Sequence, residues 1–375
     1  MQKKIIALAV AAAFSAPALA DTTVYGIIDA AVANVSATGQ KSDLLVVSGG
    51  QSGSRLGFKG AEEISGDLKV VYQLEYALDT QTNTTLASAR QQMLGVAGGF
   101  GTVATGYLQT AGYDWAVKFD PLAGSLVSPL QVVNQTNFLI GATAIAKRAP
   151  RALAYISPNL GGVTVAVNYS SSFDNALGNL TLADNATAGL KTTAMLASVT
   201  YAAGPLAVGG VLAKTSDATS TGAATASGKA TTYSDYSLGA SFDLSVVKLF
   251  ATYQSTKHTD PATAAAIEGG KAYSFTGVIP VGADGAVGVA YAKNSLTNKA
   301  ANAGQNHNGS SFLVGYLHNL SSTTNAYVAF QSAKNGANTS AYSVDNNALA
   351  GSTAPNWVSG GGSSRLIAVG MRKKF

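Results

Sequence analysis

The chain ends with the stretch Arg365-Leu-Ile-Ala-Val-Gly-Met-Arg-Lys-Lys-Phe375, which decides the fold. Alternate side chains of a β-strand point to opposite faces. Ile367, Val369, Met371 and Phe375 therefore share one apolar face, while the other face is mostly small or charged. A long apolar edge of this kind invites aggregation in a water-soluble domain. It suits the closing strand of a barrel whose outer face meets lipid.

The composition agrees with a membrane barrel. Charged residues make up 11% of the chain, against roughly 25% in ordinary soluble domains. Glycine is abundant at 41 residues, proline is scarce at 9, and cysteine is absent. Beyond residue 20, no stretch reaches the roughly 18 apolar residues of a spanning helix. A membrane protein without such helices must be a closed barrel, because every backbone polar group in lipid needs an internal partner.

Residues 1–20 are expected to be a secretory signal peptide, which leaves 21–375 as the mature domain. Lys3 and Lys4 precede a short apolar run, and Ala18-Leu-Ala20 forms a small-residue cleavage site. The run is too short for a membrane anchor. The formal net charge of the whole chain is +5. The sequence has no Lys/Arg tract with interleaved aromatic residues, so it does not predict a nucleic-acid partner.

Strand-like segments recur along the whole chain, and their lengths match the roughly 9–11 residues of a tilted membrane strand. The sixteen predicted segments are 22–35, 52–61, 67–80, 89–98, 101–110, 149–157, 161–171, 191–202, 205–214, 231–243, 245–257, 270–281, 285–294, 310–319, 323–334 and 363–375.

The connections between these segments alternate between two kinds. Short Gly/Asn/Asp/Ser turns alternate with long polar connections. The long ones include 111–148, 172–190, 215–230, 295–309 and 335–362. Outer-membrane barrels have this asymmetry, with short turns at one end and long loops at the other. The sequence therefore predicts an all-β, sixteen-stranded antiparallel transmembrane barrel.

Charged residues within the strands indicate which face meets water. Leu56 and Phe58 share one face of their strand, whereas Arg55 and Lys59 share the other. In the next strand, Lys69 and Glu75 oppose an apolar face. A charge on the lipid face at the bilayer midplane costs roughly 2–4 kcal/mol. These charged side chains are therefore expected to face a water-filled interior.

Several stretches together resemble the general diffusion porins of Gram-negative bacteria, in the neisserial and Burkholderia-type branch. They are Thr23-Val-Tyr-Gly-Ile-Ile-Asp-Ala30, Ser52-Gly-Ser-Arg-Leu-Gly-Phe-Lys-Gly-Ala-Glu-Glu63, Gly66-Asp-Leu-Lys-Val-Val-Tyr-Gln-Leu-Glu75, Gly98-Gly-Phe-Gly-Thr-Val-Ala-Thr-Gly106, Tyr155-Ile-Ser-Pro158 and Val369-Gly-Met-Arg-Lys-Lys-Phe375. They span nearly the whole mature chain in the expected order.

The resemblance implies a homotrimer in the outer membrane, in contact with outer-membrane lipids and lipopolysaccharide. It implies passive flow of small hydrophilic solutes and inorganic ions, without a cofactor. It also implies that the loop after the fifth strand, 111–148 here, folds into the barrel and narrows it. A connection of that length inside a compact domain is usually functional.

No set of residues predicts an enzyme. His258, His307 and His318 lack metal-ligand spacing and are expected at the surface. In related porins, arginines on the barrel wall face an acidic inward loop. The residues here that match such a constriction are Arg55, Arg90, Arg148 and Lys59 on the wall, and Asp114 and Asp120 in the loop. Arg90 shares the parity of Leu94 and Val96, so a β-bulge must turn it inward.

Two departures from the family weaken the expected ion selectivity. Tyr107 stands where relatives often have an arginine, and the stretch 131–137 of the inward loop is poor in acids. The sequence therefore predicts a modest anion preference. Tyr113 and Trp115 leave open a substrate-specific channel with stacked rings. A surface adhesin is a further alternative, but it predicts repeats that the sequence lacks.

Overall fold

The computed structural model describes residues 22–81, 88–134, 138–144, 146–171, 193–217, 231–260, 265–298, 306–337, 339, 342–344 and 360–375. The predicted signal peptide and the predicted loop 172–190 lie outside these residues. The predicted loops 215–230, 295–309 and 335–362 lie partly outside them. The strands Gly285–Asn298 and Asn306–Asn319 extend into the two ends of the predicted loop 295–309.

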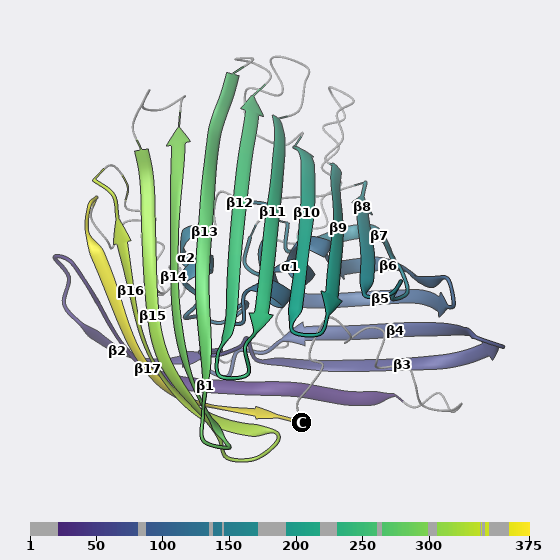
Figure 1. The fold of residues 1–375 in the computed structure, drawn as a ribbon, viewed down its shortest axis with the longest axis horizontal. Coiled ribbons are helices and arrows are strands. Elements are labelled where there is room, and N and C mark those ends of the chain that lie inside the picture. The colour runs from purple at the N-terminus through teal and green to yellow at the C-terminus, as the bar shows by residue number, and fades with distance from the viewer. Residues whose placement is uncertain are drawn as a thin grey trace.

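The described residues form seventeen antiparallel strand segments and two short helices (Figure 1). The segments are β1 (Thr23–Ala37), β2 (Asp43–Ser48), β3 (Arg55–Ser65), β4 (Leu68–Ala77), β5 (Ala89–Gly98), β6 (Gly101–Gln109), β7 (Arg148–Ile156), β8 (Val163–Ser170), β9 (Thr193–Ala203), β10 (Leu206–Asp217), β11 (Thr231–Asp243), β12 (Lys248–Asp260), β13 (Ala265–Val281), β14 (Gly285–Asn298), β15 (Asn306–Asn319), β16 (Thr324–Asn335) and β17 (Ser363–Lys374). The helices are α1 (Ala111–Phe119) and α2 (Pro129–Asn134).

Two of the strand segments share one position in the barrel wall. β3 pairs with β1 over Thr23–Ile27, and β2 pairs with β1 over Ala30–Val35. β2 and β3 therefore lie end to end beside β1, separated by residues 49–54. The seventeen segments occupy sixteen wall positions, which confirms the sixteen-stranded barrel. The predicted strand 52–61 misses β2 altogether, because glycines 49, 50 and 53 interrupt the pattern.

The last strand closes the barrel against the first. β17 pairs with β1 from Ile27↔Lys374 to Ala37↔Ser364. Gly26 and Phe375 then exchange two backbone hydrogen bonds of 3.0 and 3.1 Å. On β17, Ile367, Val369 and Met371 are 51, 59 and 52% exposed, whereas Leu366 is fully buried. The predicted apolar outer face and closing role of this strand are both confirmed.

The closure leaves no room for a side chain at residue 26. A Cβ on Gly26 would meet the Phe375 ring and the backbone oxygen of Arg55. We expect Gly26→Val to destabilise the folded barrel by about 1–3 kcal/mol, because overpacking forces the closed seam apart. The measurement is the temperature at which the heat-modifiable gel band unfolds. Gly288→Val on β14 is the matched control, since its Cβ would enter open space, and an equal loss in both variants would contradict the closure.

Short turns join the strands at one end of the wall. In Figure 1 the long strands β9–β15 meet at turns at the bottom, the same end as the C-terminus. Gly66 and Gly282 lie in two of these turns with φ of +59° and +62°, the left-handed region that glycine adopts without strain. The predicted division into a turn end and a loop end is thereby consistent with the described connections.

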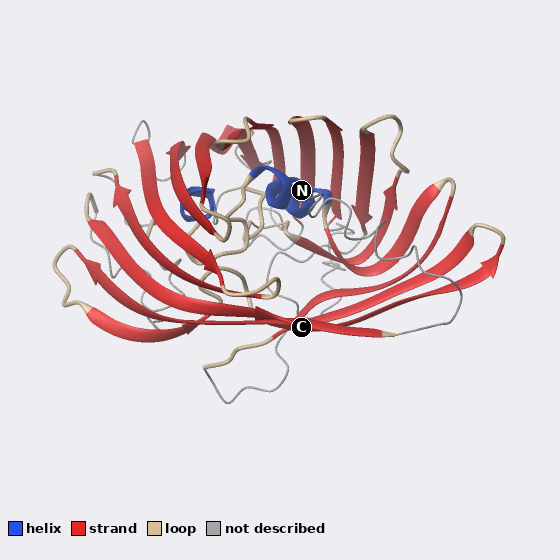
Figure 2. Cartoon of the chain, turned by 60° about the horizontal axis from the view of Figure 1, so that its bottom comes forward, coloured by secondary structure: helices blue, strands red, loops and turns tan. Residues whose placement is uncertain are grey.

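The connection after β6 folds into the barrel. Thr110 caps α1, since its hydroxyl oxygen accepts the backbone N–H of Tyr113 at 3.3 Å. α1 packs against β8–β12, and α2 packs against β13–β16. Figure 2 shows both helices enclosed by the strands. Neither helix of the described chain has the length and apolar character needed to cross a membrane. The inward third loop is therefore confirmed, with its described residues 110–134, 138–144, 146 and 147 lying along the inner wall.

Candidate functional site

A carboxylate on β4 gathers two of the predicted arginines on the inner wall. Glu75 is 5% exposed, and its Oε1 lies 2.6 Å from Nε of Arg90 and 3.8 Å from Nη1 of Arg55. The hydroxyl of Tyr25 donates to Oε2 of Glu75 at 3.0 Å. Charge-assisted hydrogen bonds of this kind are stronger than neutral ones. Glu75 therefore fixes guanidinium groups from β3 and β5 side by side.

A β-bulge turns Arg90 toward the interior. Gln91 pairs with Glu75, but the next pair joins Ala89 to Tyr76, so Arg90 is the extra residue of β5. The inserted residue changes the alternation of faces. This explains why Arg90 reaches Glu75 although its parity matches outward-facing Leu94. The bulge that the sequence required for this residue is present.

Arg148 brings β7 to the same place. Its Nε donates to the backbone oxygen of Arg90 at 2.6 Å, and its guanidinium carbon lies 5.0 Å from the Tyr113 ring centroid. Arg90 donates to the Tyr113 hydroxyl at 3.4 Å. Nη2 of Arg148 is buried and makes no hydrogen bond to the described residues. Arg55, Arg90 and Arg148 thus form one cluster on the wall, which meets the inward loop at Tyr113.

Further cations line the inner wall beside this cluster. Lys59 lies on the inner face of β3, with Nζ 5.3 Å from the Tyr25 ring centroid. On β17, Nη1 of Arg372 donates to the Ser52 hydroxyl at 3.4 Å. Arg372 and Glu75 are not among the site residues predicted from the sequence. Both stand on the charged, inward parity of their strands, which was the signal for finding them.

The two predicted loop acids lie in different surroundings. Asp120 is 4% exposed; its Oδ2 accepts from the Ser128 hydroxyl at 2.6 Å and its Oδ1 from the Leu122 N–H at 2.9 Å. It therefore holds the bend between α1 and α2. Asp114 is exposed and borders a cavity of about 40 Å³ on the inner face of β5–β8, beside Gln91 and Asn168.

The burial of Asp120 predicts a pH dependence of the loop. Burial raises the pKa of the Asp120 carboxyl from 3.8 to about 6, although its hydrogen bonds from Ser128 and Leu122 oppose the shift. The folded loop therefore binds the proton more readily than the unfolded chain. Its stabilisation by Asp120 is complete below about pH 4 and is lost as the pH rises through about 6.

We expect the open-channel current noise to increase from about pH 4 to about pH 7, as Asp120 ionises. Asp120→Asn keeps the shape of the side chain and cannot ionise, so its noise should vary less over this range. The quantity to compare is the noise at each pH in single-channel records of both proteins. Identical pH profiles would rule out Asp120 as the titrating group.

Two aromatic or titratable residues differ from the sequence interpretation. Trp115 is 1% exposed and packs against the wall, so it does not line an aromatic track. His258 lies inside β12, is 5% exposed and contacts the Thr256 hydroxyl at 3.0 Å. Its expected surface position is therefore wrong. Across the described ranges, no group of three or more His, Asp or Glu side chains could hold a metal ion.

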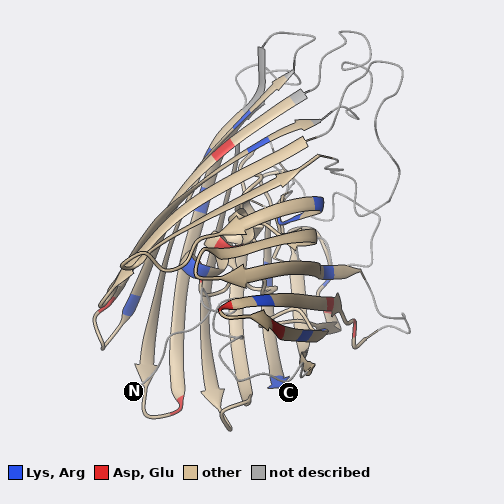
Figure 3. Ribbon diagram, turned by 90° about the vertical axis from the view of Figure 1, so that its right-hand side faces the viewer, with Lys and Arg blue, Asp and Glu red and all other residues tan. Residues whose placement is uncertain are grey.

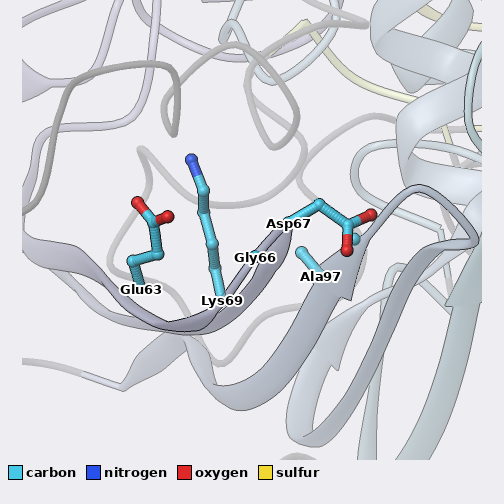
Figure 4. A pocket seen from close by; sticks show the side chains of 6 residues that line it. Glu63, Gly66, Asp67, Lys69 and Ala97 are labelled. Atoms are coloured by element: carbon cyan, nitrogen blue, oxygen red, sulfur yellow. The ribbon is translucent and has the colours of Figure 1, made fainter.

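A separate hollow of about 360 Å³ lies at the turn between β3 and β4 (Figure 4). Glu63 and Lys69, which are cross-strand neighbours, stand side by side there. Asp67 points away from them and accepts the Gly99 N–H at 2.6 Å. This carboxylate ties two neighbouring turns together. The hollow lies at the turn end of the wall, apart from the arginine cluster.

Comparison with known proteins places this geometry in one family. A family model described as Gram-negative porin matches residues 7–338. The chain is 29% identical to outer membrane porin protein 32 of Delftia acidovorans over 336 residues, covering 87% of this chain and 88% of that protein. It is 31% identical over 188 residues to the major outer membrane protein P.IB of Neisseria gonorrhoeae, covering 48% and 51% of the two chains.

Solved structures share the fold. An anion-selective porin from Comamonas acidovorans superposes with a TM-score of 0.76 at 24% identity, over 95% of this chain and all of that one. OmpT of Vibrio cholerae in its trimer form superposes with a TM-score of 0.66 at 15% identity, over 95% and 99% of the two chains. The sixteen-position closed barrel is therefore the same architecture as these channels.

Proposed function

Because the chain belongs to the Gram-negative porin family, a family of outer-membrane channels and not of enzymes, we propose that it passes small hydrophilic solutes with a modest preference for anions. The observation that carries the proposal is the cluster of Arg55, Arg90 and Arg148, which faces the inward loop and in which Glu75 pairs with Arg55 and Arg90. Fixed charge in a narrow passage sets ion preference. The anion-selective porin from Comamonas acidovorans has a similar fold, which agrees with this proposal.

The proposed mechanism is diffusion through water between the loop and the arginine-bearing wall. The size of a solute limits its passage where Tyr113 meets Arg90 and Arg148, and its charge affects its passage over the same stretch. Lys59 extends the positive wall toward the turn end, and Arg372 adds a further cation beside the cluster. On the loop side, Asp120 is buried in internal hydrogen bonds, which leaves Asp114 as the exposed acid. The weak acidity of the loop keeps the anion preference modest.

Liposome swelling with solutes of matched size tests this proposal. Vesicles that contain the refolded mature protein are diluted into a neutral sugar, an organic anion or an organic cation. We expect all three to enter, with the anion fastest. Faster entry of the cation would contradict the charge assignment, and no entry from folded protein would contradict open diffusion.

Export and assembly complete the proposal. Residues 1–20 act as a signal peptide that is removed, so the mature protein would begin at Asp21, which N-terminal sequencing can check. The channel assembles as a homotrimer. Ala30, a small residue on the outer face of β1, would let neighbouring copies approach closely, and OmpT of Vibrio cholerae has a trimer form. A crosslinking ladder that stops below three subunits would contradict the trimer.

The outer face of β10–β16 suits contact with anionic lipid. Cross-strand rows near the loop end read Lys214–Ser234–Lys257 and Lys293–Ser310–Lys334, and all four lysines are exposed. Figure 3 colours the Lys and Arg positions blue along the ribbon. Ammonium groups at this level can bind the phosphates of outer-leaflet lipids such as lipopolysaccharide. Replacing the four lysines by glutamine should reduce the lipid that copurifies with the protein.

A further inference from the structure

Residues 49–54, the wall-break segment, interrupt the second wall position opposite Asp29. The Gly49 N–H donates to the backbone oxygen of Asp29 at 2.9 Å, and the Ser54 hydroxyl bonds both the N–H and the oxygen of Asp29. Gly49 has φ of +88°, which lets the chain leave the wall at this point. Between these two anchor points the segment lies inside the barrel instead of continuing the ladder.

The Asp29 carboxylate holds this segment in place. Asp29 is fully buried on the inner face of β1. Its Oδ2 accepts the backbone N–H of Gln51 at 2.9 Å and of Ser52 at 2.7 Å, and its Oδ1 accepts the Tyr327 hydroxyl at 2.6 Å. One carboxylate therefore ties β1, the wall-break segment and β16 together. Hydrogen bonds to a buried ionised group are costly to lose.

The other side of the wall-break segment contacts the constriction. The Leu126 N–H of the inward loop donates to the Gly50 oxygen at 3.1 Å, and the Gly53 N–H donates to the Gly124 oxygen at 3.3 Å. The Gly53 oxygen accepts Nε of Arg55 at 3.0 Å. A Cβ on Gly53 would lie 3.5 Å from Nη1 of Arg90. The segment thus bonds the loop through Gly50 and Gly53 and bonds Arg55 through Gly53, and Gly53 faces the guanidinium of Arg90.

We propose that Asp29 is a positioning residue for the constriction: it fixes the wall-break segment, which in turn fixes Arg55 and the inward loop at residues 124–126. Asp29 itself does not meet the passing solute. The inference rests on the proposed constriction between the loop and the arginine cluster. It adds a further attachment of the loop, besides the packing of α1 against β8–β12 and of α2 against β13–β16.

Single-channel recording of the Asp29→Ala variant tests the proposal. We expect a rise in open-channel noise and roughly a tenfold or greater rise in the ratio of closed to open time, because bonds to a charged acceptor are lost. Asp29→Asn should stay close to the unmodified protein, since its amide oxygen can accept both N–H groups and its amide can donate to Tyr327. Asn34→Ala, exposed on the same strand, is the control.

A merely structural role would lower the unfolding temperature of Asp29→Ala and leave noise and closure unchanged, which would overturn the proposal. If Asp29→Ala does not refold, Tyr327→Phe removes only one of the bonds to the Asp29 carboxylate and should give a smaller rise in the same direction. A ratio of closed to open time in Tyr327→Phe equal to that of the unmodified protein would then overturn the proposal. A noisy Asp29→Ala channel in a protein that lacks anion preference would preserve this inference and remove only the proposed selectivity.

Discussion

Charge reversal at both Arg55 and Arg148 is expected to turn the channel from anion preference to cation preference. Both side chains stand in the cluster around Glu75 and Tyr113. Two substitutions by glutamate replace two positive charges with two negative ones at the proposed constriction. At about 4 Å in water each unit charge contributes about 1 kcal/mol, so the anion-to-cation permeability ratio should fall at least tenfold. The measurement is the zero-current potential of the variant under a salt gradient.

The control for this experiment is Arg365→Glu on β17. Arg365 is exposed on the outer face of the same barrel. The substitution therefore changes the net charge of the protein without changing the charge of its interior. Its zero-current potential should match that of the unmodified protein. If Arg365→Glu shifted the potential as much as the double variant, general surface charge would explain the effect. An unchanged potential in the double variant would remove Arg55 and Arg148 from the constriction.

Trp115→Ala is expected to detach the first helix of the loop from the wall and raise the conductance. Trp115 is almost fully buried, its Nε1 donates to the Gly209 oxygen at 3.3 Å, and its ring centroid lies 5.7 Å from that of Phe119. Phe119 in turn fills the space that a Cβ on Gly239 would occupy. Removing a buried tryptophan costs about 3–5 kcal/mol.

The effect of Trp115→Ala should appear as larger and noisier conductance steps in a barrel that still migrates as folded on a gel. Val246→Ala, in the exposed turn between β11 and β12, is the comparison because Val246 is 74% exposed and packs against little. Conductance steps equal to those of the unmodified protein would show that α1 does not depend on Trp115 for its position.

The barrel could be predicted because alternation of side chains is local information. Leu366 and Ile367 are neighbours in the sequence and therefore point to opposite faces of β17, and this alternation alone identifies the face that meets lipid. The break between β2 and β3 escaped prediction because it depends on Asp29 and Tyr327, which are 298 residues apart in the sequence. Nothing in the local pattern around Gly49 says which distant group will hold the segment.

The site divides in the same way. Arg55 could be placed inside by parity, and Arg90 could be placed only by a bulge whose position follows from pairing with β4. Asp120 was expected at an acidic rim, and the structure puts its carboxylate in hydrogen bonds within the loop. A loop's charge can be counted from sequence, but which acids it buries depends on how it folds. Glu75 illustrates the reverse case, a residue whose inward facing was predicted and whose partners were not.

The most direct test of this account is the zero-current potential of the unmodified mature protein in a planar bilayer under a salt gradient. The arginine cluster predicts a potential of the sign given by faster anion flow, together with stable conductance steps. A potential of the opposite sign would leave the barrel intact and contradict the proposed role of Arg55, Arg90 and Arg148.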